Sequence, residues 1–252
     1  MSVKNIESLL RSLRLSAAAN ELESVLAAQK KAVSLGWVED LLSKELDCRR
    51  EKALQIRIKS AKFPELKSTE NFDWDFNPEI NREKIEGLNS LDFLKDNKIV
   101  LLLGQPGTGK THIALSLALK VVCQGERVFC TSLKRLIQEI RIAKERNTMD
   151  KLFKKILSSK LWILDDWGVV SMPRDIGEEV FDLLDRRKYS SSMILTSNRD
   201  VTEWPEVFSD RVLSSAALDR IFDRAEIIVF KGKSYRLSGR IEIRSDKLEM
   251  LN

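Results

Sequence analysis

The sequence is poor in the residues on which several common kinds of site depend. A single histidine in 252 residues, His112, excludes a catalytic histidine pair and a multi-histidine metal site within one chain. The three cysteines stand at wide spacings, which indicates packing in a reducing cytoplasm rather than a disulfide framework or a metal knuckle. The apolar run from Ile99 to Leu103 is too short to cross a bilayer, and the first residues lack the apolar core of a secretory signal. These absences predict a cytoplasmic protein with no membrane partner.

Basic residues are in slight excess, and they are unevenly placed. Lys and Arg number 43 against 38 Asp and Glu, which gives a formal net charge of +5. Residues 49–62 hold six bases and one acid, residues 133–157 hold eight bases and three acids, and residues 65–96 hold nine acids and four bases. Basic segments favour a polyanionic partner such as nucleic acid or a membrane surface. A solvated helix face has the same composition, so charge alone leaves both interpretations open.

Apolar spacing divides the chain into three parts. Residues 1–66 have apolar side chains at helical spacing, which predicts three or four short helices with a break at Gly36. Residues 67–97 are acidic with scattered aromatic side chains, so we expect a linker packed on the domain that follows. From residue 98 onward, apolar strands alternate with amphipathic helices, which is typical of an α/β sheet. The strands are expected at 99–103, 128–131, 161–165, 193–196 and 226–230, and the helices at 111–123, 133–157, 177–188 and 213–222.

Residues 104–111 fit the phosphate-loop pattern G-x-x-x-x-G-K-[ST], with an apolar strand before and a helix after. Gly107 and Gly109 allow backbone angles at which successive N–H groups converge on a phosphate, and the helix N-terminus favours the anion. Lys110 supplies a point charge for the β- and γ-phosphates, and the Thr111 hydroxyl is a ligand for Mg²⁺. The cofactors expected are therefore ATP and Mg²⁺. The predicted nucleotide-binding residues are Gly104, Gln105, Pro106, Gly107, Thr108, Gly109, Lys110, Thr111 and His112, the last with no catalytic role.

Two further strand ends carry polar side chains. The strand at 161–165 ends in Asp165 and Asp166, which predicts that Asp165 holds Mg²⁺ and that Asp166 orients or deprotonates the attacking water. An Asp at a strand-to-helix turn is also a common helix cap, which is the alternative interpretation. Asn198 follows the strand at 193–196, where its amide would contact the γ-phosphate or the lytic water, although by itself it is equally a turn residue.

Together, these motifs resemble the IstB-like ATP-binding proteins, the ATPase helpers of transposition encoded beside a transposase. The likeness rests on residues 102–114 around the phosphate loop, Leu-Asp-Asp-Trp-Gly ending at Gly168, and Leu-Thr-Ser-Asn ending at Asn198. It extends to Glu203-Trp204, Ala-Leu-Asp-Arg ending at Arg220, and Ser-Tyr-Arg ending at Arg236, and so covers nearly the whole chain. The family is similar to the DnaC and DnaA branch of AAA+ ATPases. The resemblance implies an α/β fold of the AAA+ class, a parallel-sheet ATPase domain over residues 98–252 with a small helical domain before it.

The resemblance also implies a function. A member of this family binds duplex DNA with ATP, self-assembles, remodels target DNA and recruits or stimulates a transposase. Arg220 then corresponds to an arginine finger that completes the site of a neighbouring subunit, and Arg236 to a second sensor, with Arg211 and Arg224 as competitors. The second acid is Asp166 rather than the more widespread Glu, so slow basal hydrolysis is expected. Too few residues follow Phe230 for a full helical lid.

The basic segments, including residues 231–247, are the expected sites of DNA contact. They contain no base-reading motif, so binding should be largely independent of sequence and steeply salt-dependent. The residues predicted to touch DNA are Arg49, Arg50, Arg57, Lys59, Lys62, Lys134, Arg135, Arg141 and Lys144. Two other functions stay open at this point: a replicative helicase loader of the DnaC type, and a small-molecule kinase, which would yield a phosphorylated product.

Overall fold

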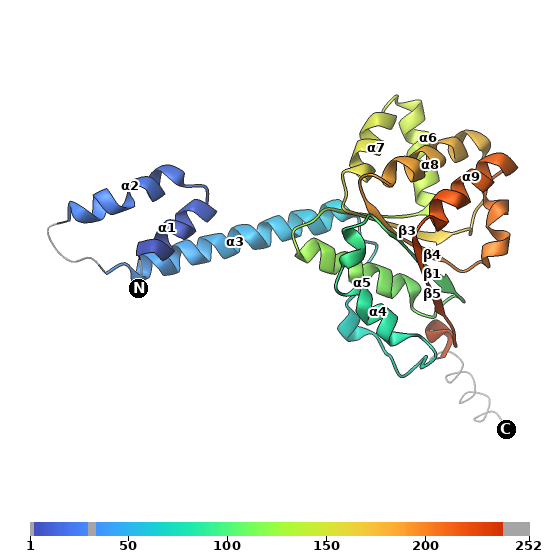
Figure 1. Cartoon of the computed structure of the whole chain (residues 1–252), viewed down its shortest axis with the longest axis horizontal. Helices are drawn as coiled ribbons and strands as arrows, with labels where there is room; N and C mark the ends of the chain where they lie inside the picture. Colours follow the sequence, from blue (N-terminus) through green and yellow to red (C-terminus); the bar gives the residue numbers. More distant parts are fainter. Residues whose placement is uncertain (1–2, 30–33, 239–252) are drawn as a thin grey trace, which may run out of the picture. The chain divides into compact units, whose positions relative to one another are not determined.

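The computed structural model of the chain describes residues 3–29 and 34–238 (Figure 1). They divide into two units, one up to Ile56 and one from Arg57 onward. The division falls inside a long helix, within the basic segment at 49–62. Arg49 and Arg50 therefore belong to the first unit, and Arg57, Lys59 and Lys62 to the second.

The first unit is helical. Helices α1 (Val3–Ser12) and α2 (Ser16–Ala27) precede α3 (Gly36–Ala61), and Ile6, Leu10 and Ala19 are buried at their centre. Gly36 is the first residue of α3, so it stands at a helix boundary, as predicted. The expectation of short helices is wrong for α3, which runs for 26 residues. No glycine or proline occurs between residues 37 and 61, so nothing in that stretch ends the helix.

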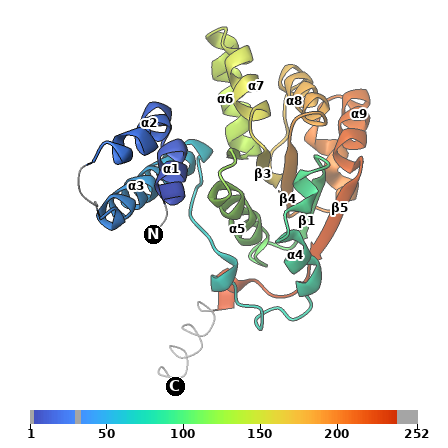
Figure 2. The ribbon, with the colours of Figure 1, turned by 60° about the vertical axis from the view of Figure 1, so that its left-hand side comes forward.

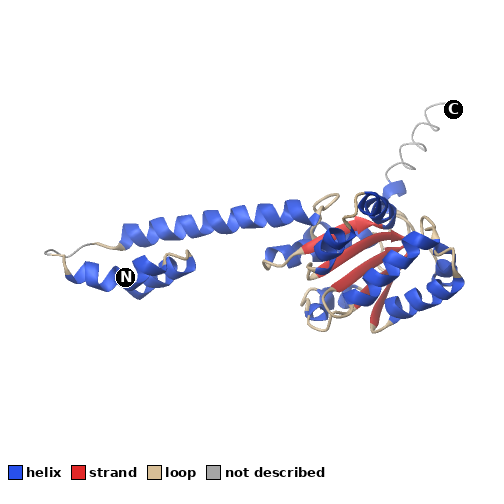
Figure 3. Ribbon diagram, turned by 90° about the horizontal axis from the view of Figure 1, so that it is seen from above, coloured by secondary structure: helices blue, strands red, loops and turns tan. Residues whose placement is uncertain are grey.

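The second unit is built on a parallel five-stranded sheet. Its strands are β1 (Ile99–Gly104), β2 (Val128–Ser132), β3 (Leu161–Trp167), β4 (Ser192–Ser197) and β5 (Ala225–Phe230), in the spatial order β2-β3-β4-β1-β5. Leu101 of β1, which lies between β4 and β5, is in register with Leu195 of β4 and Ile227 of β5. The strands lie side by side between the helices in Figure 3. This confirms the α/β fold predicted from the alternation of strands and helices.

Helices cover both faces of the sheet (Figure 2). Helix α5 (Lys110–Cys123) lies on one face, and the other face is covered by α6 (Leu133–Glu145), α7 (Met149–Leu157), α8 (Arg174–Arg187) and α9 (Arg211–Phe222). The single helix expected over 133–157 is two helices, because Asn147 between them adopts a left-handed backbone with φ of 51°. Helix α8 begins at Arg174 rather than at Gly177, directly after Pro173. Proline has its ring-fixed φ and lacks an N–H, so it is suited to the start of a helix.

The acidic stretch at 67–97 is folded into this second unit. It contains η1 (Thr69–Asn71), α4 (Arg82–Leu88) and η2 (Asp92–Leu94), and a further short helix, η3 (Val201–Val207), precedes α9. Ile85 and Phe93 are buried, and Phe93 accepts a hydrogen bond through its carbonyl from the Ser192 hydroxyl of β4 at 3.0 Å. Within the described residues, no helix combines the length and the apolar character that crossing a membrane requires.

Candidate nucleotide-binding and hydrolysis site

The phosphate loop connects β1 to α5 at the carboxyl edge of the sheet. Gly107 and Gly109 have φ of 79° and 103°, the left-handed region that favours glycine. A Cβ atom on Gly109 would overlap the Phe72 ring, and one on Gly107 would overlap the Ser234 hydroxyl. These two glycines are therefore needed both for the turn and for the close approach of segments from elsewhere in the chain.

Lys110 is buried beneath the loop. Its ammonium group donates hydrogen bonds to the carbonyl oxygens of Gly104 and Gln105, each at 2.7 Å, and only 4% of the residue is exposed. Burial lowers the pKa of Lys110 to about 8, although Asp165 and Asp166 nearby favour its charged form. The lysine is thus a desolvated cation that a phosphate oxygen would stabilise.

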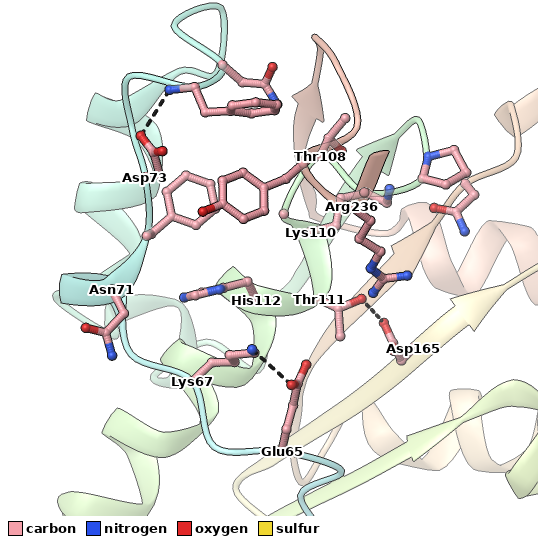
Figure 4. Close-up of a pocket in the computed structure, with 18 of the residues that line it drawn as sticks. Glu65, Lys67, Asn71, Asp73, Thr108, Lys110, Thr111, His112, Asp165 and Arg236 are labelled. Carbon is pink, nitrogen blue, oxygen red and sulfur yellow. Dashed lines mark hydrogen bonds and ion pairs between the residues drawn. The ribbon is translucent and has the colours of Figure 1, made fainter. Parts of the chain in front are cut away.

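Asp165 is the centre of a small hydrogen-bond network. Its Oδ1 accepts from the Thr111 hydroxyl at 2.9 Å (Figure 4) and from the Thr196 hydroxyl at 2.5 Å. Thr196 is 1% exposed and also accepts a hydrogen bond from the Asp166 N–H at 3.1 Å. Sequence reasoning placed Thr111 and Asp165 together but gave Thr196 no role. Its position in the polar end of β4, beside the strand that carries Asp165, was the available signal.

Thr111 and Asp165 offer two hard oxygen donors of the kind that suits Mg²⁺. Among the residues that the structure describes, no group of three or more His, Cys, Asp or Glu side chains is arranged to hold a metal. Mg²⁺ is commonly held by one or two protein oxygens, with phosphate oxygens and water completing its shell. The small donor set therefore fits a cation that arrives with a nucleotide.

Asp166 and Asn198 line the same cavity as Asp165. The pKa of Asp166 is raised by burial and by the neighbouring carboxylate of Asp165. Its backbone has φ of 58°, a left-handed conformation that is uncommon outside glycine. A carboxylate with a raised pKa is a better proton acceptor than an ordinary one, which suits a general base.

The cavity has a volume of about 700 Å³ and is partly lined by residues that sequence reasoning assigned to a linker. We call residues 64–77 the strap. Phe72 of the strap meets the His112 ring edge-on with centroids 5.3 Å apart, and His112 Nε2 donates to the Ser68 carbonyl at 2.7 Å. His112, expected to contact the nucleotide, thus holds the strap against α5. Aromatic residues scattered at 72–76 were the signal in the sequence.

The two late arginines lie in different places. Arg236 lines the cavity, and Figure 4 shows its guanidinium near Thr111 and Asp165. Arg220 lies outside the cavity on α9, where its Nε donates to Asp185 at 2.6 Å and its Nη1 to Asp219 at 2.8 Å. Together with Arg211 it lines a separate surface groove.

The motifs around Arg220 are divided between core and surface. In Ala-Leu-Asp-Arg, Ala217 is fully buried, whereas Asp219 and Arg220 face outward. In Glu203-Trp204, the indole is fully buried and stacks on Phe222 of α9 with centroids 5.6 Å apart. Trp204 therefore supports α9 from beneath rather than contributing to a site.

Several of the predicted DNA contacts are engaged within the chain. Lys62 pairs with Glu139 at 2.5 Å, and Lys144 pairs with Glu179 at 3.1 Å, so each joins two elements of the second unit. Arg57 donates to the Val122 carbonyl at 3.3 Å.

In the first unit, Arg49 pairs with Glu45 at 2.7 Å and donates to the Leu13 carbonyl at 3.0 Å, and Arg50 pairs with Asp47 at 3.4 Å. The exposed members are Arg49, Arg50, Lys59, Lys134, Arg135 and Arg141. Of the basic segment at 231–247, residues 239–247 lie outside the described residues.

The family model for IstB-like ATP binding proteins matches residues 8–243. This chain belongs to that family. The insertion sequence IS21 ATP-binding protein of Pseudomonas aeruginosa is 36% identical to this IstB-like chain over 92% of it and 88% of the relative. The corresponding protein of insertion sequence IS5376 from Geobacillus stearothermophilus is 30% identical, over 78% of each chain.

Solved structures agree with the fold of this IstB-like protein. DnaI is similar with a TM-score of 0.55 and 21% identity, over 67% of this chain and 89% of that one. AMPPCP-bound DnaA from Aquifex aeolicus is similar with a TM-score of 0.56 and 20% identity, over 75% of this chain and 56% of that one. The chain therefore shares the phosphate-loop α/β fold of these structures and belongs to a family of ATP-binding proteins.

Proposed function

We propose that this chain binds Mg²⁺ and ATP, assembles with further copies of itself on duplex target DNA, remodels that DNA, and recruits or stimulates the transposase of its insertion sequence. The observation that carries the proposal is the placement of the two arginines. The chain's own cavity contains Arg236 but not Arg220, which stands on the outer side of α9 beside a groove. An arginine so placed is suited to complete the site of a neighbouring copy.

Within one chain, each side chain has a separable task. Lys110 exchanges its two carbonyl partners for phosphate oxygens, and Thr111 and Asp165 hold Mg²⁺. The metal supplies positive charge that offsets the negative charge of the phosphates. Asp166 accepts the proton of the attacking water, and Asn198 orients that water or the γ-phosphate. Because Asp166 is shorter than the more widespread Glu, we expect hydrolysis to be slow until DNA or a partner adjusts the site.

Arg220 supports assembly because its present partners are replaceable. Asp185 and Asp219 hold it at the surface, and all three side chains are at least a third exposed. An exposed ion pair of this kind contributes little to stability, so a phosphoryl group from a neighbouring copy competes effectively for the guanidinium. An arginine finger contributes about 10³ to 10⁵ in hydrolysis rate.

The contact with DNA is proposed for the exposed basic residues. Lys134 and Arg141 stand seven residues apart on α6 and so share one face of that helix, with Arg135 beside them. Arg49, Arg50 and Lys59 are exposed on α3. Lys62 and Lys144 already have carboxylate partners, so we expect them to contribute less. Sequence-independent contact with phosphates weakens steeply as salt increases.

A helicase loader of the DnaC type remains the alternative. The fold alone does not decide between the two functions, because one fold carries many functions. The insertion-sequence relatives at 30% to 36% identity favour transposition. Stimulation of helicase loading, without any effect on a transposase, would support the alternative.

Sedimentation on duplex DNA, with and without ATP, tests the assembly. We expect wild type to form ATP-dependent larger species on DNA, Lys110→Ala to lose them, and Lys120→Ala, an exposed lysine on the same helix, to retain them. No change of size with nucleotide would contradict the proposal.

Mixing inactive variants tests whether sites are shared. Lys110→Ala and Arg220→Ala should each be inactive alone, whereas an equal mixture should recover hydrolysis, because some interfaces combine an intact loop with an intact arginine. The matched control is Arg186→Ala, which removes an exposed arginine paired with Asp182 at 2.7 Å on the neighbouring helix α8 and should stay active. A mixture that stays inactive would count against Arg220 as a finger.

A further inference from the structure

One asparagine holds the segment after β5 in place. Asn77 is 5% exposed, and its side-chain amide makes two hydrogen bonds to the backbone of Lys233. Its Nδ2 donates to the Lys233 carbonyl at 3.0 Å, and its Oδ1 accepts from the Lys233 N–H at 2.9 Å. A carboxamide is suited to this task because it carries a donor and an acceptor side by side. We call this pair of bonds the Asn77 clip.

The backbone next to the clip is shaped to admit it. Gly232 has φ of 111°, and a Cβ atom there would overlap Asn77 Oδ1. A side chain at position 232 would therefore both strain the backbone and push the asparagine away. The clip therefore depends on Asn77 in the strap and on Gly232 in the segment after β5.

The same segment touches the phosphate loop immediately afterwards. The Tyr235 N–H donates to the Gly107 carbonyl at 3.0 Å, and the Tyr235 ring meets Phe76 of the strap edge-on with centroids 4.9 Å apart. Residues 233–235 are thus held at both ends, by Asn77 and by the loop. The next residue is Arg236, whose guanidinium lies near Thr111 and Asp165 in the cavity (Figure 4).

We propose that Asn77 is the positioning residue for Arg236. By fixing the backbone of Lys233, it sets where Arg236 enters the cavity, and it joins the strap to the segment that carries Arg236. The inference rests on the proposed function and on the sensor role that the family resemblance implies for Arg236, which we take to be a contact with the γ-phosphate of ATP. Release of the clip should therefore weaken ATP binding more than ADP binding, because ADP has no γ-phosphate for Arg236 to contact.

The test compares Arg236→Ala, Asn77→Asp, Gly232→Ala and the double variant Asn77→Asp/Arg236→Ala in the full chain. Asn77→Asp keeps the size of the side chain and its acceptor but loses the donor, and Gly232→Ala breaks the clip from the other side. The matched control is Asn81→Ala, an exposed asparagine nearby whose side chain caps α4 through the Lys84 N–H at 2.9 Å. ATP and ADP affinities are measured with fluorescent nucleotides, alongside the hydrolysis rate and thermal unfolding.

We expect Arg236→Ala, Asn77→Asp and Gly232→Ala each to lower the preference for ATP over ADP about tenfold, the effect of one lost hydrogen bond to a charged group. The double variant should be no worse than Arg236→Ala, and Asn81→Ala should keep the wild-type preference. Additive losses, an equal loss of ATP and ADP affinity, or wild-type behaviour of Asn77→Asp and Gly232→Ala would overturn the inference. If Asn77→Asp does not fold, Gly232→Ala decides between these outcomes. If Arg236→Ala behaves as wild type, both the inference and the proposed role of Arg236 fail, whereas a defect in Arg236→Ala alone refutes only the inference.

Discussion

Replacing Thr196 with valine tests whether the hydroxyl at the end of β4 holds Asp165 in its productive orientation. Valine keeps the shape and removes the group that donates to Asp165 Oδ1 at 2.5 Å and accepts from the Asp166 N–H at 3.1 Å. A hydrogen bond to a charged group contributes about 1.5–3 kcal/mol, and a buried amide without a partner costs about 1–3 kcal/mol. Because both effects concern one atom and are not additive, we expect the free energy of unfolding to fall by about 2–3 kcal/mol.

The functional loss should appear in the dependence on Mg²⁺. Loss of a side chain that orients a metal ligand typically costs about 10- to 100-fold in metal affinity or activity. We therefore expect the Mg²⁺ concentration for half-maximal hydrolysis to rise by a factor in that range. The assay is a Mg²⁺ titration of steady-state ATP hydrolysis, with unfolding followed separately.

Two controls separate this effect from a general loss of stability. Thr196→Ser keeps the hydroxyl and should restore most of the wild-type Mg²⁺ dependence. Thr131→Val removes a buried hydroxyl at the end of β2, whose partner is the Ser132 carbonyl at 3.2 Å, so it should alter stability and leave Mg²⁺ dependence unchanged. If Thr196→Val is destabilised but has the wild-type Mg²⁺ dependence, Thr196 is a packing residue and the reasoning is refuted.

Three further outcomes are expected. The pKa of Lys110 is about 8, and a bound phosphate favours its charged form, so at a pH about one unit above that pKa the lysine should take up a proton when ATP binds, and ATP affinity should fall as pH rises. Calorimetry in buffers of different ionisation enthalpy would detect this proton uptake, and its absence would contradict the prediction. Gly109→Ala should abolish ATP binding, because the new Cβ atom would overlap the Phe72 ring. Its control, Gly125→Ala, also has a positive φ, of 94°, but a Cβ atom there meets no atom within 4 Å, so it should cost only about 1–2 kcal/mol of stability. Equal nucleotide affinities for the two variants would refute this prediction. Burial raises the pKa of the Cys130 thiol, so a thiol reagent should modify the exposed Cys48 and Cys123 of the folded chain and leave Cys130 unmodified until denaturant is added. Rapid modification of all three cysteines without denaturant would contradict the burial of Cys130.

The phosphate loop and its strand-loop-helix setting could be predicted from local sequence alone. The glycines at 107 and 109 are demanded by backbone angles, and the apolar run at 99–103 is long enough for a buried strand, so each constraint acts within a few residues. Asp165 could be placed for a related reason. It follows an apolar run near the carboxyl end of β3, and the carboxyl ends of parallel strands meet at one edge of a sheet, where ligands bind.

The long α3 and the break at Asn147 were missed because periodicity does not report where a helix ends. Helix ends depend on single residues, here the absence of glycine and proline after Gly36 and a left-handed asparagine between α6 and α7. Such single-residue signals are weak compared with the repeating apolar pattern, which looks the same whether the helix continues, as in α3, or breaks, as at Asn147.

Local sequence is enough to predict the phosphate loop and the residues that form it, because a phosphate loop is a local structure. What surrounds the loop depends on the tertiary structure. The strap, through Asn77, and the segment carrying Arg236 are brought together across 156 residues by hydrogen bonds to backbone atoms, which any residue except proline at position 233 could provide. The sequence at Lys233 therefore carries no trace of that contact. For the same reason, the separation of Arg236 in the cavity from Arg220 on α9 became visible only once the sheet had placed their two elements.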